Sequence, residues 1–152
     1  MATEIETETE ADRLAANKDL VRTMMSLLVD PATSDEARQY LTESYLQHNP
    51  NIASGADAII AWTKTDEARR ARESMRPSPE APVFVAEGDK VVMMLARDVP
   101  DPDDPTKTYR SYWFDMWRVE DGKLAEHWDA APKEVSSDGA DERLLRDDSP
   151  RV

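Results

Sequence analysis

Apolar residues recur at helical spacing through the first half of the chain. Val21, Met24 and Leu28 are three or four positions apart, which places their side chains on one face of a helix. Ser54 and, three residues later, Asp57 resemble a capping box at the start of another helix. The pattern predicts helices over residues 11–29, 34–41 and 55–76.

The spacing of the apolar residues becomes that of strands after residue 82. The stretch PVFVAEGDKVVMMLARDV contains two β-rich runs around Gly88-Asp89, which predicts a hairpin. An acidic, proline-rich loop at 100–107 separates it from a second hairpin, TYRSYWFDMWRVEDGKLAEHWDA, at 108–130. Helices followed by antiparallel strands indicate an α+β fold.

Charge and composition suggest where the folded unit begins and ends. We expect one domain over residues 10–134, since the segments on either side are polar and acidic. Residues 1–9 and 135–152 are predicted to be disordered tails.

The turn of the second hairpin decides which of its side chains are neighbours. Glu120-Asp121-Gly122 suits a three-residue turn, in which Val119 pairs with Lys123. In this register one face holds aromatic and acidic side chains together with an imidazole, namely Trp113, Asp115, Trp117, His127 and Asp129. The other face is almost wholly apolar, with Tyr112, Phe114, Met116, Leu124 and Trp128.

The two faces predict different surroundings. An apolar lining with a few polar groups is typical of a ligand pocket, so we expect the mixed face to line a cavity under the helices. The apolar face is expected to pack against a second copy of the chain, through Phe114, Met116 and Trp128.

The net charge of −13 narrows the range of partners. Nucleic acids and anionic membrane surfaces are not expected, because both are bound through clustered Lys and Arg. No apolar run is long enough to span a bilayer. The chain has no cysteine and an acidic N-terminus, so we expect a cytoplasmic protein without disulfides or thiolate chemistry.

Three spaced motifs resemble a known family. The strings YLQHNP, AEGDKVV and FDMWRVEDGKLAEHWD occur in an order similar to the SnoaL-like branch of the nuclear transport factor 2-like superfamily, over about residues 12–131. The resemblance implies a cone-shaped, curved antiparallel sheet wrapped around N-terminal helices, also called a cystatin-like α+β barrel. It also implies a deep pocket and a homodimer. Family enzymes include polyketide cyclases, related folds carry isomerases, dehydratases and lyases, and some members only bind ligands.

The resemblance suggests candidate catalytic residues. Asp129 best fits the family's acid/base aspartate, Asp115 lies on the facing strand, and His48 in QHNP resembles a pocket histidine. A carboxylate among aromatic side chains can abstract a proton next to a carbonyl, with His127 as its partner. Alternatively, the two aspartates bond only backbone or Trp N–H groups, and His48 caps the bend at residues 49–50.

Other polar and aromatic residues are candidates for substrate binding. His48, Tyr45 or Tyr109 can donate a hydrogen bond to a forming enolate. Trp62, Trp113 and Trp117 can line the cavity, although simple core packing also explains them. The candidate substrate-binding residues are Tyr45, Trp62, Trp113, Trp117 and Tyr109.

Cofactors are not expected. No HxxxH, HxH or HxxE spacing surrounds either histidine, so no metal site is predicted, and no glycine-rich phosphate loop occurs. We therefore expect a cofactor-independent lyase, isomerase or cyclase for a small apolar carbonyl or hydroxyl compound. Cyclisation, retro-aldol cleavage, isomerisation and dehydration remain open, as does the alternative of a non-catalytic binding or assembly module.

Overall fold

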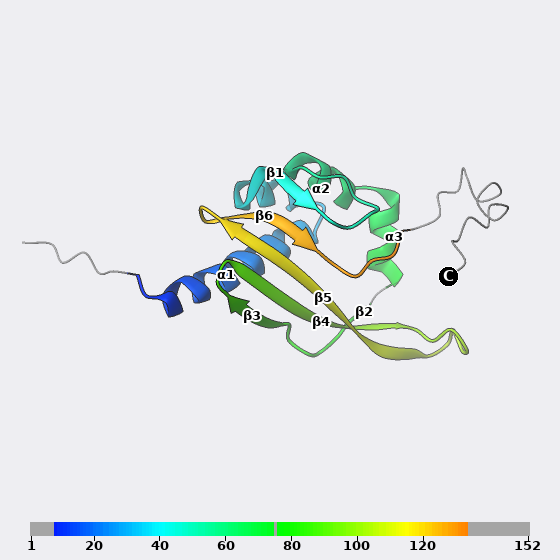
Figure 1. Cartoon of the computed structure of the whole chain (residues 1–152). Coiled ribbons are helices and arrows are strands. Elements are labelled where there is room, and N and C mark those ends of the chain that lie inside the picture. Colours follow the sequence, from blue (N-terminus) through cyan, green and yellow to red (C-terminus); the bar gives the residue numbers. More distant parts are fainter. Residues whose placement is uncertain (1–7, 75, 134–152) are drawn as a thin grey trace, which may run out of the picture.

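The computed structural model describes residues 8–74 and 76–133 (Figure 1). The predicted tail at 135–152 lies outside the described residues, and so does most of the predicted tail at 1–9. Within the described part of the chain, no helix is long and apolar enough to cross a membrane.

Helix α1, Glu10–Leu28, begins and runs as the apolar pattern predicts. The hydroxyl of Thr9 accepts a hydrogen bond from the Asp12 amide, and the Asp12 carboxylate accepts one from the Thr9 amide, which together form a capping box. Val21 and Met24 are fully buried on the face that meets the sheet. The helix is followed by the 3₁₀ helix η1, Ser34–Tyr40.

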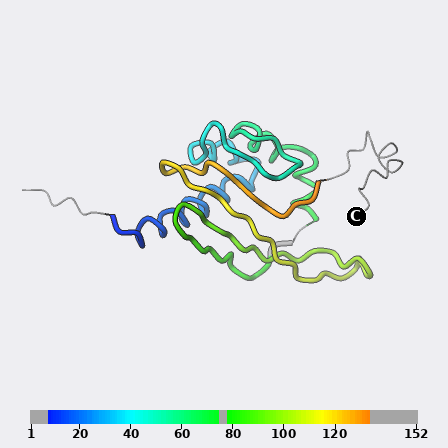
Figure 2. Tube along the Cα trace, viewed as in Figure 1, coloured from blue at the N-terminus to red at the C-terminus, as the bar shows by residue number. Residues whose placement is uncertain are grey.

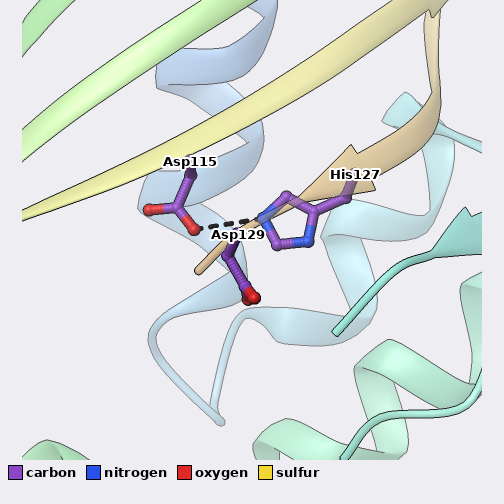
Figure 3. A group of neighbouring side chains, drawn as sticks. All are labelled: Asp115, His127 and Asp129. Carbon is purple, nitrogen blue, oxygen red and sulfur yellow. Dashed lines mark hydrogen bonds and ion pairs between the residues drawn. The ribbon is translucent and has the colours of Figure 1, made fainter. Parts of the chain in front are cut away.

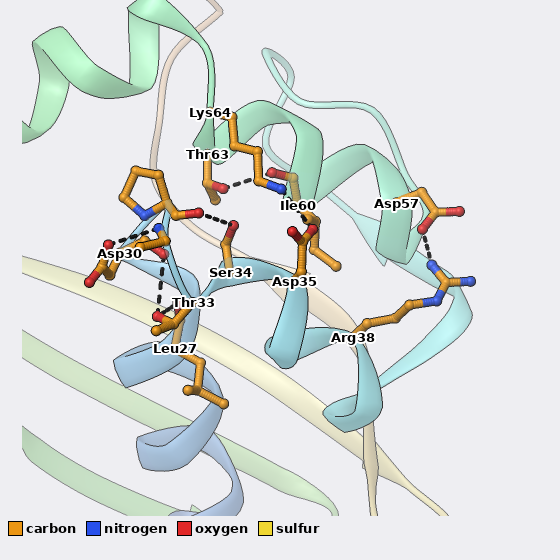
Figure 4. Close-up of polar contacts among 12 residues, drawn as sticks. Leu27, Asp30, Thr33, Ser34, Asp35, Arg38, Asp57, Ile60, Thr63 and Lys64 are labelled. Carbon is orange, nitrogen blue, oxygen red and sulfur yellow. Dashed lines mark hydrogen bonds and ion pairs between the residues drawn. The ribbon is translucent and has the colours of Figure 1, made fainter.

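The third predicted helix is two helices, α2 (Ala56–Thr63) and α3 (Asp66–Ser74). The predicted capping box of Ser54 and Asp57 is wrong, because the Ser54 hydroxyl accepts the Gln47 amide. The Asp57 carboxylate instead pairs with the guanidinium of Arg38 on η1 (Figure 4). Lys64 likewise reaches Asp35, so two ion pairs join α2 and the residue after it to η1.

The sheet is mixed, with strand order β1-β6-β5-β4-β2 and β3 also paired with β4. The α+β prediction and the curved sheet beside N-terminal helices are confirmed. The prediction of a wholly antiparallel sheet is wrong at one pair, because β1 runs parallel to β6. The strands are β1 (Leu41–Gln47), β2 (Arg76–Pro77), β3 (Val83–Glu87), β4 (Lys90–Pro100), β5 (Thr108–Glu120) and β6 (Lys123–Trp128).

The core lies between one face of the sheet, here called the inner face, and the helices. Trp117 and Leu124 of the inner face are almost wholly buried, together with Met24 of α1. Burying such side chains stabilises the fold by about 1.5–3 kcal/mol each. On β4, β5 and β6, the inner-face residues of the core are Val91, Met93, Trp117 and Leu124.

The opposite face, here called the outer face, carries exposed apolar side chains on β3 and β5. Phe114 is 57% exposed and Val85 is 61% exposed. Phe114, Met116 and Trp128 share this face, as predicted, because Met116 pairs with Trp128 across β5 and β6. Leu124 does not belong to it: it is fully buried and pairs with Val119 on the inner face.

Strands β4 and β5 continue together well beyond the end of β6. They pair as far as Pro100 and Thr108, whereas β6 pairs with β5 only as far as Met116. Figure 2 shows this ribbon projecting past the body of the domain. The acidic loop expected at 100–107 is closed by the Asp101 amide, which donates to the Lys107 carbonyl at 3.0 Å.

Candidate active site

The turn between β5 and β6 differs from the predicted one. Asp121 and Gly122 have φ angles of 49° and 72°, and Glu120 pairs with Lys123, so the turn has two central residues. A register shift between Arg118 and Val119 then moves the pairing by one more residue, as a β-bulge does. The predicted partners are therefore wrong.

The two shifts together preserve the predicted grouping of side chains. His127 pairs with Trp117 rather than with Asp115, which is a displacement of two positions along β5. Because side chains alternate with a period of two, Asp115, Trp117 and His127 still share the inner face.

His127 is the centre of a hydrogen-bonded group at the end of β6. Its ring is 7% exposed, and its Nε2 lies 3.1 Å from Oδ1 of Asp115. Its Nδ1 lies 2.8 Å from Oε1 of Gln47, at the end of β1. The same Oε1 accepts the backbone N–H of Asn49 at 2.9 Å, which identifies this Gln47 atom as the carbonyl oxygen.

These contacts determine the tautomer of His127. A carbonyl oxygen only accepts, so Nδ1 carries a hydrogen and donates it to Gln47. In a neutral ring Nε2 would then present a lone pair to the Asp115 carboxylate, and the two would repel each other. A proton between Nε2 and Asp115, on the imidazole or on the carboxyl group, completes this hydrogen bond.

Asp129 lies beside this pair, just beyond the end of β6 (Figure 3). Its Oδ2 accepts the side-chain N–H of Asn49 at 2.7 Å, and its Oδ1 accepts the Ala131 amide at 3.0 Å. Both oxygens are thus occupied by neutral donors. Only Oδ1 of Asp115 has a hydrogen bond within the described residues, so the Asp115 carboxylate retains an oxygen for a ligand.

Tyr45 and Trp117 close the inner side of the site. The Trp117 indole donates to the Tyr45 hydroxyl at 3.0 Å, and both side chains are 2% exposed. Burial raises the pKa of Tyr45, and the negative charges of Asp115 and Asp129 raise it further. The centre of the Trp117 ring also lies 4.9 Å from the centre of the His127 ring, so Trp117 packs against the imidazole as a core side chain.

His48 does not join this group. It lies on the outer face, where its ring stacks on Trp128 at 5.0 Å and its Nε2 lies 2.8 Å from Glu126. The side-chain alternation of β1 explains this position, because Gln47 is the neighbour that faces His127.

The remaining aromatic candidates lie in three different surroundings. Trp62 on α2 is half-buried, and its indole N–H has no hydrogen-bond partner within the described residues. Trp113 is on the inner face and 41% exposed, with the Arg97 guanidinium 4.9 Å from its ring centre. Tyr109, further along β5, is 49% exposed.

Two hollows are visible in the described part of the chain. One, of about 240 Å3, touches Asp115 and Asp129 and is lined by outer-face residues that include Phe114 and Trp128. The other, of about 400 Å3, lies between η1 and the start of β1. The deep cavity expected under the helices stays a prediction. Tyr45 and Trp117, which were expected to line it, belong to the buried core.

The three central side chains also form a set of metal-ligand types. One ligand atom from each of Asp115, His127 and Asp129 lies within 4.8 Å of the others. Two carboxylates and an imidazole suit divalent cations, although protons satisfy the same acceptors. The expected absence of a metal remains a prediction.

Sequence reasoning missed Gln47, Asn49 and Arg97. Gln47 and Asn49 reach the site because β1 pairs in parallel with β6. Parallel strands are not joined by a tight turn, so no turn sequence predicts this pair. Gln47-His48-Asn49 is a polar stretch at the end of a strand, and only its histidine was predicted to be functional.

Comparisons with known proteins agree with this fold. A family model described as SnoaL-like domain matches residues 21–127, more than half of the chain. Among curated proteins, none matches the sequence.

Solved structures with similar folds have low sequence identity. A nuclear transport factor 2-like protein from Burkholderia xenovorans is 18% identical, with a TM-score of 0.55 over 77% of this chain and 89% of that one. A cystatin-like protein of unknown function from Xanthomonas campestris is 15% identical, with a TM-score of 0.56 over 77% and 91%. A candidate polyketide cyclase from Sinorhizobium meliloti is 16% identical, with a TM-score of 0.53 over 74% and 94%.

Proposed function

Because the chain belongs to the SnoaL-like domain family, we propose that it is a cofactor-independent acid/base enzyme for a small apolar carbonyl or hydroxyl compound. The observation that carries this proposal is the His127–Asp115 pair, in which Nε2 lies 3.1 Å from the carboxylate while Nδ1 is directed at Gln47. A buried pair that holds one proton beside an available carboxylate oxygen supports proton transfer.

Asp115 is proposed as the base. Its Oδ2 takes a proton from the carbon next to the substrate carbonyl, the C–H bond breaks, and its electron pair enters the enolate. The positive charge of the His127 imidazolium, still bonded to Oδ1, stabilises the new negative charge. Asp115 later returns the proton to the product.

Asp129 is the alternative base, and its two hydrogen bonds argue for a different role. Donation from Asn49 and from the Ala131 amide occupies both of its oxygens, which leaves neither of them for a substrate proton. Its negative charge balances the imidazolium of His127. His48 receives no role in the proposed reaction, because it contacts Glu126 and Trp128 on the outer face.

The proposed step is common to cyclisation, retro-aldol cleavage, isomerisation and dehydration next to a carbonyl. A non-catalytic binding module is the rival function. The hydrogen bonds to both oxygens of Asp129 favour this rival, because they give the carboxylate a structural role without any reaction. Asp115, with one oxygen left for a ligand, favours the enzyme.

We also propose a homodimer that packs through the outer face. Phe114 is 57% exposed, and Met116 and Trp128 adjoin it, so two copies can remove a continuous apolar surface from water. The expected cytoplasmic location stays a prediction.

Hydrogen–deuterium exchange tests the proposed proton transfer without knowledge of the overall reaction. The protein is incubated in D2O with 1-tetralone, acetophenone and 3-benzoylpropanoate, and loss of the proton next to the ketone is followed by NMR. The wild-type protein is expected to accelerate exchange of at least one compound, and Asp115→Asn to slow it by about 10²–10⁴-fold.

The control is Glu43→Gln, which removes an exposed carboxylate elsewhere on β1 and should keep the wild-type rate. Full exchange in both Asp115→Asn and Asp129→Asn would contradict the proposal. So would a wild-type protein that binds the ketones without exchanging them, which would favour the binding module.

A further inference from the structure

Arg97 of β4 shares the inner face with the candidate base. Met93 pairs with Asp115 across β4 and β5, Leu95 pairs with Trp113, and Arg97 pairs with Ser111. Residues two apart in a strand point to the same face, about 7 Å apart along it. Arg97 therefore lies on the same side of the sheet as Asp115, with Trp113 between them.

Trp113 holds the Arg97 guanidinium in a defined position. The guanidinium carbon lies 4.9 Å from the centre of the Trp113 ring, a cation–π contact. Arg97 is half-buried, and burial lowers its pKa while the charge of Asp115 opposes this change. An arginine nevertheless keeps its charge throughout the physiological range, so a fixed cation faces the inner side of the sheet.

The inner face opens to solvent at this end. Trp117 is 2% exposed, Asp115 is half-buried, and Trp113 is 41% exposed, although all three share one face of β5. On this face of β5, exposure therefore increases from Trp117 to Trp113, which lies beside Arg97.

We infer that Arg97, positioned by Trp113, forms a subsite for a carboxylate group of the substrate. A guanidinium offers paired N–H donors that match the two oxygens of a carboxylate. The inference rests on the proposed function, because it places the acidic C–H of the same molecule near Asp115. The substrate class is then a carbonyl compound with a carboxylate a few bonds from its acidic carbon.

The overall charge of the protein makes a local cation necessary for such a substrate. With a net charge of −13, the surface repels anions at long range, and two further carboxylates lie at the site itself. A carboxylate that binds here must be compensated by a nearby cation, and the Arg97 guanidinium beside Trp113 supplies one.

Binding of two matched ligands tests this subsite. Affinities of 3-benzoylpropanoate and its neutral amide, 3-benzoylpropanamide, are measured by calorimetry for the wild-type protein and for Arg97→Met, Arg97→Lys and Arg70→Met. Arg70 is an exposed arginine on α3 and controls for the loss of one positive charge.

The wild-type protein is expected to bind the carboxylate about tenfold more tightly than the amide. Arg97→Met should abolish this preference and leave the affinity for the amide unchanged, Arg97→Lys should keep part of it, and Arg70→Met should keep all of it. Equal affinities in the wild-type protein, a preference that survives Arg97→Met, or no binding of either compound would overturn the inference.

The test separates this inference from the proposed function. A carboxylate preference that depends on Arg97, without deuterium exchange, would leave the subsite in place and contradict the enzyme. Exchange that depends on Asp115, without a carboxylate preference, would support the enzyme and contradict the subsite.

Discussion

The side-chain carbonyl of Gln47 lies 2.8 Å from Nδ1 of His127 and thereby directs Nε2 of the imidazole at Asp115. The two residues are 80 positions apart in the sequence, and the parallel pairing of β1 with β6 brings them together. The proposed chemistry depends on this relationship, because it decides which nitrogen shares the proton with the carboxylate.

Removing the Gln47 carbonyl should impair proton transfer. Gln47→Leu leaves Nδ1 without its acceptor and allows the other tautomer, so we expect deuterium exchange to slow by at least about tenfold. Gln47→Glu keeps an acceptor at this position and should retain more of the rate than Gln47→Leu. Equal rates in the wild-type protein and Gln47→Leu would show that the tautomer does not matter.

The hydroxyl of Tyr45 should contribute to stability. Tyr45→Phe leaves the buried indole N–H of Trp117 without its acceptor, and we expect the free energy of unfolding to fall by about 1–3 kcal/mol. Urea denaturation measures the difference. The matched control is Tyr112→Phe, which removes a hydroxyl from a half-exposed side chain and should change stability by less than about 0.5 kcal/mol.

Glu126 should make stability depend on pH in the acidic range. Hydrogen bonds from Arg118 and, next, His48 lower the pKa of Glu126 from its ordinary value of 4.5. Since the pKa is lower in the folded state, the stabilisation is present above pH 4.5 and is lost as the pH falls through the lowered value.

Urea denaturation of the wild-type protein and Glu126→Gln from pH 7 to pH 2.5 tests this dependence. The difference in unfolding free energy should be largest above pH 4.5 and shrink below it. The control Glu87→Gln removes an exposed carboxylate at the end of β3 and should not show this trend. A difference that grows as the pH falls would contradict the sign.

Chelation should leave the activity unchanged. Protein treated with EDTA and returned to metal-free buffer is expected to exchange deuterium at the untreated rate, since protons satisfy the acceptors of Asp115, His127 and Asp129. Loss of exchange on chelation, restored by one divalent ion and not by others, would show instead that these side chains hold a catalytic metal.

Phe114→Glu should separate the proposed dimer. A carboxylate at the centre of the apolar outer face would be buried without a partner, so light scattering should give the mass of one chain. Val29→Glu places the same charge on an exposed apolar residue at the end of α1 and should remain dimeric. A wild-type protein with the mass of a single chain would contradict the dimer itself.

Local signals predicted much of this fold. The spacing of Val21, Met24 and Leu28 predicted α1 and its buried face, and Gly88-Asp89 predicted the turn between β3 and β4. The inner-face grouping of Asp115 with His127 was also predicted, although the two-residue turn and the register shift that produce it were not. The two deviations preserve the grouping because side chains alternate with a period of two.

Long-range contacts account for what local reasoning missed. Nothing near Gln47 or Asn49 in the sequence indicates that β1 will pair in parallel with β6, so their contacts with His127 and Asp129 were not foreseeable. In the sequence, Arg97 is a charged residue of a strand with no signal of its own. The pairing of β4 with β5 places it on the same face as Trp113 and Asp115. His48 was assigned to the pocket from its motif, and its strand position places it on the outer face.

The most direct test of the central claim is a 15N NMR titration of the imidazole nitrogens. The chain has two histidines, so histidine-labelled protein gives two rings, and His48→Gln identifies the signals of His127. The account predicts that Nδ1 of His127 carries a hydrogen across the neutral range, and that Asp115→Asn changes the signal of Nε2. A neutral ring with its hydrogen on Nε2 and none on Nδ1 would contradict it.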